Sequence, residues 1–276
     1  MLPAGAHGHA LALSVAMPQP GDVNQHRSAL LPHQARQCRL HLDRPLPPEV
    51  ELIAIPLTLE RAIPKRQRQF RAGRYCAMKA MEALDPRFAA QQVGRAASGA
   101  PLWPDGVTGS ITHTDDFVSA AVARTTDAIA LGIDTERIMS ESQARDVGRM
   151  VAWPVEVAYA RAAGMTRLEA LTLVFSAKES MFKTLHPMVG QFFDFRDVRI
   201  VGVDAHAHTF TARIVRTLSD RFPAQTLLQG RFEVEVPWVH TGIALQPGHD
   251  EWSHHQNRMD QVLPLAGVAD LRRGLV

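Results

Sequence analysis

The chain has 276 residues, of which 46% are hydrophobic, which is enough apolar material for one large core or two smaller ones. Its formal net charge of +2 excludes the strongly basic coat of a general nucleic-acid binder. The two cysteines, Cys38 and Cys76, are too few for a disulfide framework and favour a reducing compartment.

The N-terminal region lacks the features of a secretory signal. A short apolar run at residues 11–16 has no charged segment before it, because the first cation is Arg27. No apolar stretch approaches the length of a membrane span. We therefore expect a cytoplasmic protein whose first 30 residues form a poorly ordered tail.

The first half of the chain is predicted to combine a long helix with short strands. One strand is expected near 50–55, and Pro64 then opens a helical pattern over 64–84, which the Asp85-Pro86 pair ends. Residues 97–109 are rich in Gly and Pro and indicate a loop. Strands are expected at 109–113, 117–123 and 128–133, with 124–127 as a hairpin turn between the last two.

The second half repeats this order of helix and strands. Thr166 and Glu169 fit a capping box, which predicts a helix over 167–185 that stops before Pro187. Alternating patterns then predict strands at 208–215, 230–237 and 239–245. The residues from Pro247 onward fit no element.

Two carboxylates follow an apolar run in the segment 131–136 (LGIDTE). In an extended chain, side chains two residues apart point to the same side, so Asp134 and Glu136 face one point. Such a pair suits Mg²⁺, which combines carboxylates with water and substrate phosphates. Taken alone, however, the pattern more often means two solvated acids at a strand end.

A charged pair lies on the predicted second helix, in the segment 175–183 (FSAKESMFK). Glu179 and Lys183 are four residues apart and share a helix face. As a surface ion pair they would contribute only ~0.3–0.5 kcal/mol, so stability is a weak reason for their presence. A solvated helix face is still the more common meaning of this motif alone.

The segment 109–113 (GSITH) places small residues before a histidine. Gly109 and Ser110 would let a backbone approach a ligand closely, and His113 could donate a hydrogen bond to a phosphate. A single histidine at a strand end is more often structural or simply exposed.

Five cations fall within ten residues at the start of the first helix, in the segment 65–74 (KRQRQFRAGR). Arginine suits phosphate because its planar guanidinium binds two oxygens at once. The alternatives are a solvated basic face and nucleic-acid binding, although aromatic residues are sparse here. One basic helix in a nearly neutral chain favours a small phosphate-bearing ligand. The five are Lys65, Arg66, Arg68, Arg71 and Arg74.

No motif is specific alone, but their combination is. A basic helix with AGR, a PLWP loop, GSITH, GIDTE and FSAKES follow in this order, and the set closely resembles the 4′-phosphopantetheinyl transferase superfamily. The likeness covers residues 30–200. Within the superfamily the chain is most similar to the larger monomeric type, in particular to the enterobactin-synthase component D group.

The resemblance implies a reaction. Enzymes of this family move the 4′-phosphopantetheine arm of coenzyme A to a serine of an apo carrier protein, release 3′,5′-ADP and use Mg²⁺. The implied metal ligands are Asp134, Glu136 and Glu179, and a pyrophosphate beside three carboxylates does need a divalent cation between them. Glu179 is also the implied base for the serine, directly or through a water.

The other implied contacts are with coenzyme A. Lys178 and Lys183 would offset charge on the phosphates and the leaving group, and His113 with Thr112 would contact the pyrophosphate. The family usually has Ser at the position of Thr112, and the hydroxyl is retained. Many members carry a basic or polar residue where this chain has Ala100, and Arg95 could substitute for it. The basic cluster implied for the 3′-phosphate is Lys65, Arg66, Arg68, Arg71 and Arg74, with the contacting member left open.

The implied fold is α+β, with two similar subdomains related by a pseudo-two-fold axis. Each is a long helix packed on a small antiparallel sheet, with coenzyme A between the subdomains. The expected divisions are a flexible tail at 1–30, a nucleotide-side subdomain at 31–127, a subdomain at 128–250 for Mg²⁺ and the catalytic acids, and a tail of unknown role at 251–276. A doubled chain completes its own site, so we expect a monomer.

Two functions of other classes remain. A coenzyme A-binding protein without transferase activity would need fewer carboxylates than this chain has. A nucleic-acid binder would leave the acids unexplained, so we expect no nucleic-acid partner. The carrier protein stays unidentified, and the component D likeness favours siderophore or nonribosomal peptide synthesis only by analogy.

Overall fold

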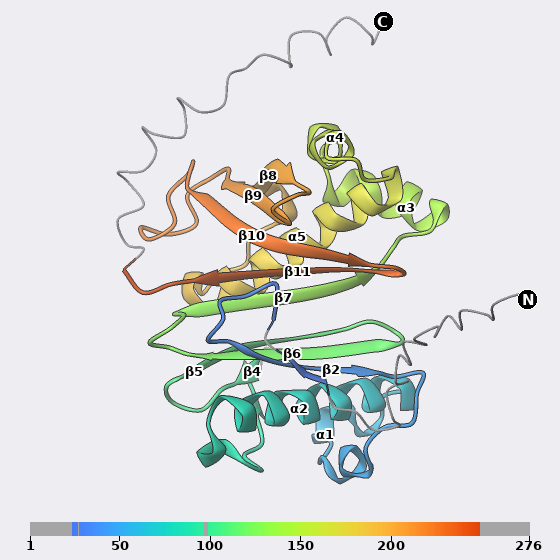
Figure 1. The fold of residues 1–276 in the computed structure, drawn as a ribbon, viewed down its shortest axis with the longest axis vertical. Helices are drawn as coiled ribbons and strands as arrows, with labels where there is room; N and C mark the ends of the chain where they lie inside the picture. Colours follow the sequence, from blue (N-terminus) through green and yellow to red (C-terminus); the bar gives the residue numbers. More distant parts are fainter. Residues whose placement is uncertain (1–23, 27, 97–98, 249–276) are drawn as a thin grey trace, which may run out of the picture.

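The structure is a computed structural model that describes residues 24–26, 28–96 and 99–248. It has two halves, each an antiparallel sheet with a long helix on one face, and the two sheets meet in the middle of the molecule (Figure 1). This confirms the predicted α+β architecture with two subdomains.

The first half is built on a sheet with the strand order β1-β2-β6-β5. Its long helix, α2 (Pro64–Leu84), packs on β2 and β6. The strands are β1 (Asn24–His26), β2 (Arg36–His41), β5 (Val107–His113) and β6 (Phe117–Arg124). The short elements are a 3₁₀ helix at Pro48–Leu52, α1 (Leu57–Glu60), a 3₁₀ helix at Pro86–Phe88, and the ribbon of β3 (Gly94–Arg95) and β4 (Pro101–Leu102).

The second half is built on a sheet with the strand order β7-β11-β10-β9-β8. Its long helix is α5 (Arg167–Val189), and α3 (Glu141–Val151) and α4 (Pro154–Ala162) pack beside it. The strands are β7 (Ala130–Arg137), β8 (Val198–Asp204), β9 (Thr209–Ile214), β10 (Leu227–Glu235) and β11 (Trp238–Leu245), with a 3₁₀ helix at Phe195–Asp197.

Local signals set the ends of α2 as predicted. Pro64 stands in the first turn, where its missing N–H needs no partner, and the helix ends at Leu84. Asp85 is extended and its carboxylate accepts the Arg87 N–H at 3.0 Å, which starts the next 3₁₀ turn. The inner face of α2 includes several small residues that let the helix lie close to its sheet, namely Ala72, Cys76, Ala77 and Ala80.

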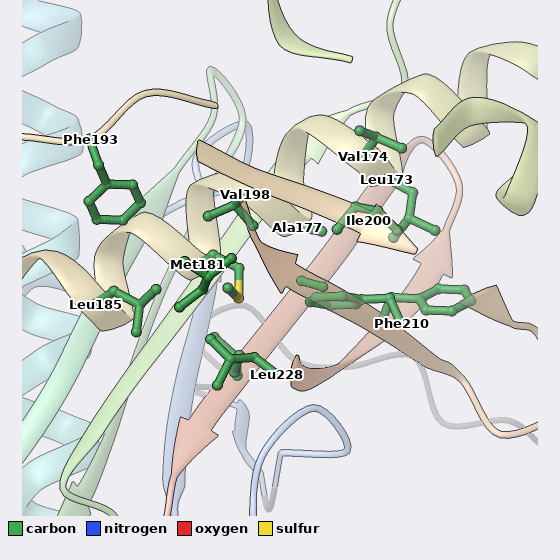
Figure 2. Close-up of a cluster of buried hydrophobic side chains, with 14 of the residues drawn as sticks. Leu173, Val174, Ala177, Met181, Leu185, Phe193, Val198, Ile200, Phe210 and Leu228 are labelled. Atoms are coloured by element: carbon green, nitrogen blue, oxygen red, sulfur yellow. The ribbon is translucent and has the colours of Figure 1, made fainter. Parts of the chain in front are cut away.

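The capping box of α5 is also confirmed. The Glu169 N–H donates to Thr166 Oγ1 at 3.3 Å, and the Thr166 N–H donates to Glu169 Oε2 at 2.8 Å. The helix then buries one apolar face against the second sheet (Figure 2). That core joins Leu173, Val174, Ala177, Met181 and Leu185 of α5 to Val198, Ile200, Phe210 and Leu228 of the strands.

The prediction that α5 stops before Pro187 is wrong. The helix continues to Val189 and closes on Gly190, which has a left-handed φ of 71°. A proline in the last turn removes a single backbone bond, and the Gly190 N–H still bonds to the His186 carbonyl at 2.9 Å. The ring of His186 also stacks on Phe182, with centroids 4.8 Å apart, which holds this final turn in place.

The strand predicted near 50–55 is wrong as well. Residues Pro48–Leu52 form a 3₁₀ helix, because Pro47 and Pro48 fix helix-compatible φ angles at its start. Val50 is still fully buried, so the apolar pattern identified a core residue but not its backbone shape. The loop predicted at 97–109 contains β4 and the start of β5, and residues 97–98 lie outside the described part.

Residues 124–127 form a turn but not the predicted hairpin. The Asp127 N–H bonds to the Arg124 carbonyl at 2.9 Å, yet the strands on either side belong to different sheets. β6 pairs with β2 and β5, whereas β7 pairs with β11. The turn therefore carries the chain from the first half to the second.

The two sheets meet where β5 lies beside β7, which we call the junction. Apolar side chains from both sides seal it, including Ala121, Leu131 and Ile133, together with Leu30 and Leu31 from the segment before β2. Folded structure thus begins before residue 31. The expected tail residues 1–23 and 251–276 lie outside the described residues. Among the described helices, none combines the length and apolarity that crossing a membrane would need.

Candidate functional site

A glycine lets α5 rest directly on β7. A Cβ added at Gly132 would lie 2.2 Å from the Ser180 carbonyl oxygen and 2.4 Å from Thr184 Oγ1, closer than real Cβ contacts. The glycine of the LGIDTE motif is therefore required by helix packing. Because the helix lies this close, the acids that follow on β7 face the charged side chains of α5.

Lys183 of α5 crosses to β7. Its Nζ donates to Asp134 Oδ1 at 2.6 Å, so it pairs with the strand acid instead of its helix neighbour Glu179. The Asp134 side chain is almost completely buried, whereas Glu136 and Glu179 are half-buried. The structure thus brings the predicted acids and Lys183 together at one place.

The three acids lie within one another's electric field. Burial, followed by the charge of Asp134, raises the pKa of Glu136 to about 8, and Glu179 adds to this effect. Burial and the charge of Asp134 also raise the pKa of Glu179. Lys183 opposes both shifts, but a single cation leaves this group of carboxylates short of positive charge.

These residues fit Mg²⁺ without enclosing it. Within the described part of the chain, no three His, Cys, Asp or Glu side chains form a ready-made metal cluster. However, Mg²⁺ commonly takes one or two carboxylates and completes its shell with water and substrate phosphates. Asp134 Oδ2 is buried and has no hydrogen-bond partner among the described residues, so it offers a free oxygen ligand. A cation there would also favour the ionised form of Glu136.

β5 contributes a histidine and a threonine to the same place. Burial, then the charges of Arg66 and Lys183, lower the pKa of His113 to about 4, so its ring is neutral at pH 7. The Arg66 guanidinium donates to its Nε2. Thr112, on the same strand, bonds to Asp134 across the junction. Arg66 therefore belongs with His113, close to the acids.

The other cations of the basic helix do not gather at this point. Lys65 forms an exposed ion pair with Asp115, at 2.6 Å. Arg68 donates to the Arg44 carbonyl at 3.3 Å, and Arg71 pairs with Glu51. Arg68 and Arg71 line a separate open hollow of about 400 Å³. The five cations of the predicted cluster therefore have different partners and do not form one group in the structure.

Arg74 is the buried member of this set. It is 6% exposed, and its guanidinium lies 5.1 Å above the Phe70 ring. Its Nε and Nη1 atoms have no hydrogen-bond partner among the described residues. Burial, then the charge of Arg95, lower its pKa to about 10. Arg74 thus keeps free guanidinium donors beside the charge of Arg95, an arrangement that fits a phosphate dianion.

Lys178 does not face the acids. Its Nζ donates to Glu156 Oε2 at 2.9 Å and to the Val151 carbonyl at 3.0 Å, and both charged side chains are fully buried. Burial lowers the pKa of Lys178, and the charge of Glu156 opposes this. The phosphate contact expected for Lys178 is thus not what the structure shows. Glu156 was missed because nothing local distinguishes it from an exposed helix-start acid.

An apolar cavity of about 480 Å³ opens beside Glu179. Its walls come from α3, α5 and the segment after α5, including Met150, Phe175, Phe182 and Phe192. Phe192 is 74% exposed, which is unusual for so large an apolar side chain. No sequence pattern indicated this cavity, because its walls meet only in the folded chain.

Comparison with known sequences gives the family. Residues 54–123 match the 4′-phosphopantetheinyl transferase N-terminal domain, and residues 130–235 match the 4′-phosphopantetheinyl transferase superfamily. The chain is 32% identical to the transferase PptT of Mycobacterium tuberculosis over 207 residues, which cover 73% of this chain and 86% of PptT. It belongs to the 4′-phosphopantetheinyl transferase superfamily.

Other transferases of the family are similar too. Svp of Streptomyces mobaraensis is 41% identical over 56% of this chain, a match that spans 62% of Svp. Enterobactin synthase component D of Salmonella austin is 34% identical over 72% of this chain and 79% of its own length. The predicted superfamily and the likeness to component D are both confirmed, while identity to Svp is higher within a shorter match.

Proposed function

We propose that this transferase moves the 4′-phosphopantetheine group of coenzyme A to a serine of an apo carrier protein, with Mg²⁺ bound and 3′,5′-ADP released. One observation carries the proposal. Asp134, Glu136, Glu179 and Lys183 converge at the junction, and Asp134 presents a buried oxygen that no described donor satisfies.

The acids are assigned to the metal. Asp134, Glu136 and Glu179 hold Mg²⁺, which supplies positive charge to the pyrophosphate when it is bound. Lys183, His113 and Arg66 lie around the same point and contact the phosphate oxygens. Their role is to stabilise the negative charge that develops on the leaving group.

Glu179 is the proposed base. The serine oxygen attacks the β-phosphorus of coenzyme A, its proton passes to Glu179 directly or through a water, and the bond to 3′,5′-ADP breaks. Lys178 takes no part in this step, because its ammonium group is hydrogen-bonded in the core to Glu156 and to the Val151 carbonyl.

The two ends of coenzyme A are assigned to different halves. The 3′-phosphate lies against Arg74 and Arg95 in the half formed by 31–127, where Arg74 has free guanidinium donors. The pantetheine arm lies in the apolar cavity beside Glu179, in the half formed by 128–250. The pyrophosphate then crosses the junction between them.

The partner is proposed from the relatives. Several are named enterobactin synthase component D, so we propose a carrier domain of siderophore or nonribosomal peptide synthesis as the acceptor. A single chain supplies both halves of the site, which supports a monomer. The two free cysteines, Cys38 and Cys76, support the cytoplasm as its compartment.

The test is transfer to a panel of apo carrier proteins with coenzyme A and Mg²⁺, followed by mass spectrometry. We expect one phosphopantetheine per carrier, and none after Mg²⁺ is chelated. Glu179→Gln should lower the rate by roughly 10²–10⁴-fold while coenzyme A still binds.

Glu169→Gln is the matched control, because it makes the same change on the same helix and keeps the cap. It should transfer like the unchanged protein. Absence of transfer to every carrier would contradict the proposal, and full activity of Glu179→Gln would remove that residue from its role.

A further inference from the structure

The Thr112 hydroxyl connects the two halves at the acids. Thr112 lies on β5 and is 2% exposed. Its Oγ1 accepts the Thr135 N–H of β7 at 3.0 Å. The same oxygen lies 3.2 Å from Asp134 Oδ1, to which it donates its proton. Both bonds go to β7, so the hydroxyl has its one proton engaged there.

These contacts leave the two carboxylate oxygens of Asp134 in different surroundings. Oδ1 accepts hydrogen bonds from Thr112 Oγ1 at 3.2 Å and from Lys183 Nζ at 2.6 Å. Oδ2 is buried and has no donor among the described residues. Because Oδ1 is held by two donors from different elements, the carboxylate cannot rotate freely, and Oδ2 is kept as its open oxygen.

We infer that Thr112 is a positioning residue for Asp134 and does not itself contact coenzyme A. This rests on the proposed function, in which Asp134 is a Mg²⁺ ligand. The backbone N–H of Thr135 fixes the hydroxyl, the hydroxyl fixes Oδ1, and Oδ2 is left in place for the metal. The resemblance had implied a coenzyme A contact for Thr112. Because its buried hydroxyl both donates to and accepts from β7, we assign it to Asp134 instead.

The arrangement has a consequence for the whole site. Thr112 belongs to the first half and Asp134 to the second, so the metal ligand has both of its orienting contacts only when the two halves are packed at the junction. Metal affinity should therefore report on the junction, even in the absence of a carrier protein.

The test is metal binding by Thr112→Val, which removes the hydroxyl but keeps the shape of the side chain. Binding is measured with Mn²⁺ as a paramagnetic probe, in the presence of coenzyme A and without a carrier, so no turnover occurs. We expect the Kd for Mn²⁺ to rise about 10- to 100-fold, as for other residues that orient metal ligands. Thr112→Ser keeps the hydroxyl and should restore the affinity.

Steady-state transfer provides a second readout. In Thr112→Val the Mg²⁺ concentration for half-maximal rate should rise, while kcat and the KM for coenzyme A at saturating Mg²⁺ stay close to those of the unchanged protein. Thr108→Val is the matched control on the same strand, since the described residues show no side-chain hydrogen bond from Thr108. It should leave both metal readouts unchanged.

The opposite pattern overturns the inference. If Thr112→Val raises the KM for coenzyme A at saturating Mg²⁺ and leaves the Kd for Mn²⁺ unchanged, the hydroxyl contacts the substrate. If Thr112→Val does not fold, Thr112→Cys, a weak donor of similar size, replaces it and should bind Mn²⁺ less tightly than Thr112→Ser. Failure of the unchanged protein to bind metal or transfer would contradict the proposed function instead.

Discussion

The buried pair of Lys178 and Glu156 fastens several elements around one point. Glu156 of α4 accepts from Lys178 of α5 and also from the Ile200 N–H of β8, at 2.9 and 2.7 Å. Lys178 also donates to the Val151 carbonyl at the end of α3. Lys178 and Glu156 neutralise each other in the core, so removal of one charge leaves the other buried without its counterpart.

We therefore predict that Lys178→Met lowers the free energy of unfolding by about 3–5 kcal/mol. The double variant with Glu156→Gln should lose less, because no unpaired charge is then left in the core. Urea denaturation of the single and double variants measures both effects. A stable Lys178→Met protein with a raised KM for coenzyme A would instead indicate a phosphate contact.

The residues of the site were only partly predictable from the sequence. Spacing alone placed Asp134 and Glu136 on one side of a strand and Glu179 with Lys183 on one side of a helix. It could not show that Lys183 pairs with Asp134, or that Arg66 and not Arg71 lies beside His113. Those partners are distant in sequence, and only the packing of α2, β5, β7 and α5 brings them together.

At the scale of elements, the contact of α5 with β7 sets the distance between the acids. Gly132→Ala would push its Cβ into the Ser180 carbonyl and Thr184, both parts of a rigid helix. We predict a loss of about 1–3 kcal/mol in unfolding free energy, as for other overpacked cores. The Mg²⁺ concentration for half-maximal transfer should also rise, because β7 moves away from Glu179.

Gly202→Ala is the control for this prediction. It makes the same change in a strand, where the nearest atom to the new Cβ is Thr211 Cβ at 3.9 Å, an ordinary contact. Urea denaturation and Mg²⁺ titration of both variants give the comparison. Equal behaviour of the two variants would show that the close packing at Gly132 is not needed.

A helix or strand boundary was predictable from the sequence where the residues that determine it lie close together in the chain. The ends of α2 and the start of α5 depend on residues within one turn, and the sequence located them. The partners of β6 and β7 depend on strands far away in the chain, so the short apolar runs around 124–127 resembled a hairpin. Pairing between distant strands leaves no local mark.

At the scale of the whole molecule, an aromatic cluster joins the two halves. Phe117 of β6 lies 5.6 Å from the Trp238 ring and 5.1 Å from the His240 ring of β11. His41 of β2 lies 5.3 Å from Trp238. The cluster packs residues of both sheets together, so its stability contributes to holding the junction closed.

His240 gives this cluster a dependence on pH. It is 1% exposed, its Nδ1 is 2.9 Å from Thr135 Oγ1, and its Nε2 has no hydrogen-bond partner among the described residues. The charged and titratable groups around it are Arg39, His41 and Glu235, with Glu235 Oε2 3.7 Å from Nε2. Burial, then the charges of Arg39 and His41, lower its pKa from 6.5 to about 3.

The sign of the effect follows from this shift. Below pH 6.5 the unfolded chain binds a proton at His240 that the folded protein does not, so stability is lost as the pH falls toward 3. At pH 5 this single group should lower the free energy of unfolding by about 2 kcal/mol. His113 and His41, whose pKa values are also lowered by burial, act in the same direction.

We predict that His240→Gln loses less stability than the unchanged protein between pH 7.5 and pH 5, because its unfolded state no longer gains that proton. Urea denaturation at the two pH values measures the difference. His33→Gln, at an exposed position, should leave the pH dependence unchanged. If His240→Gln and the unchanged protein lose equal stability on acidification, His240 accepts a proton within the folded cluster, and the junction is held together without the neutral form of this histidine.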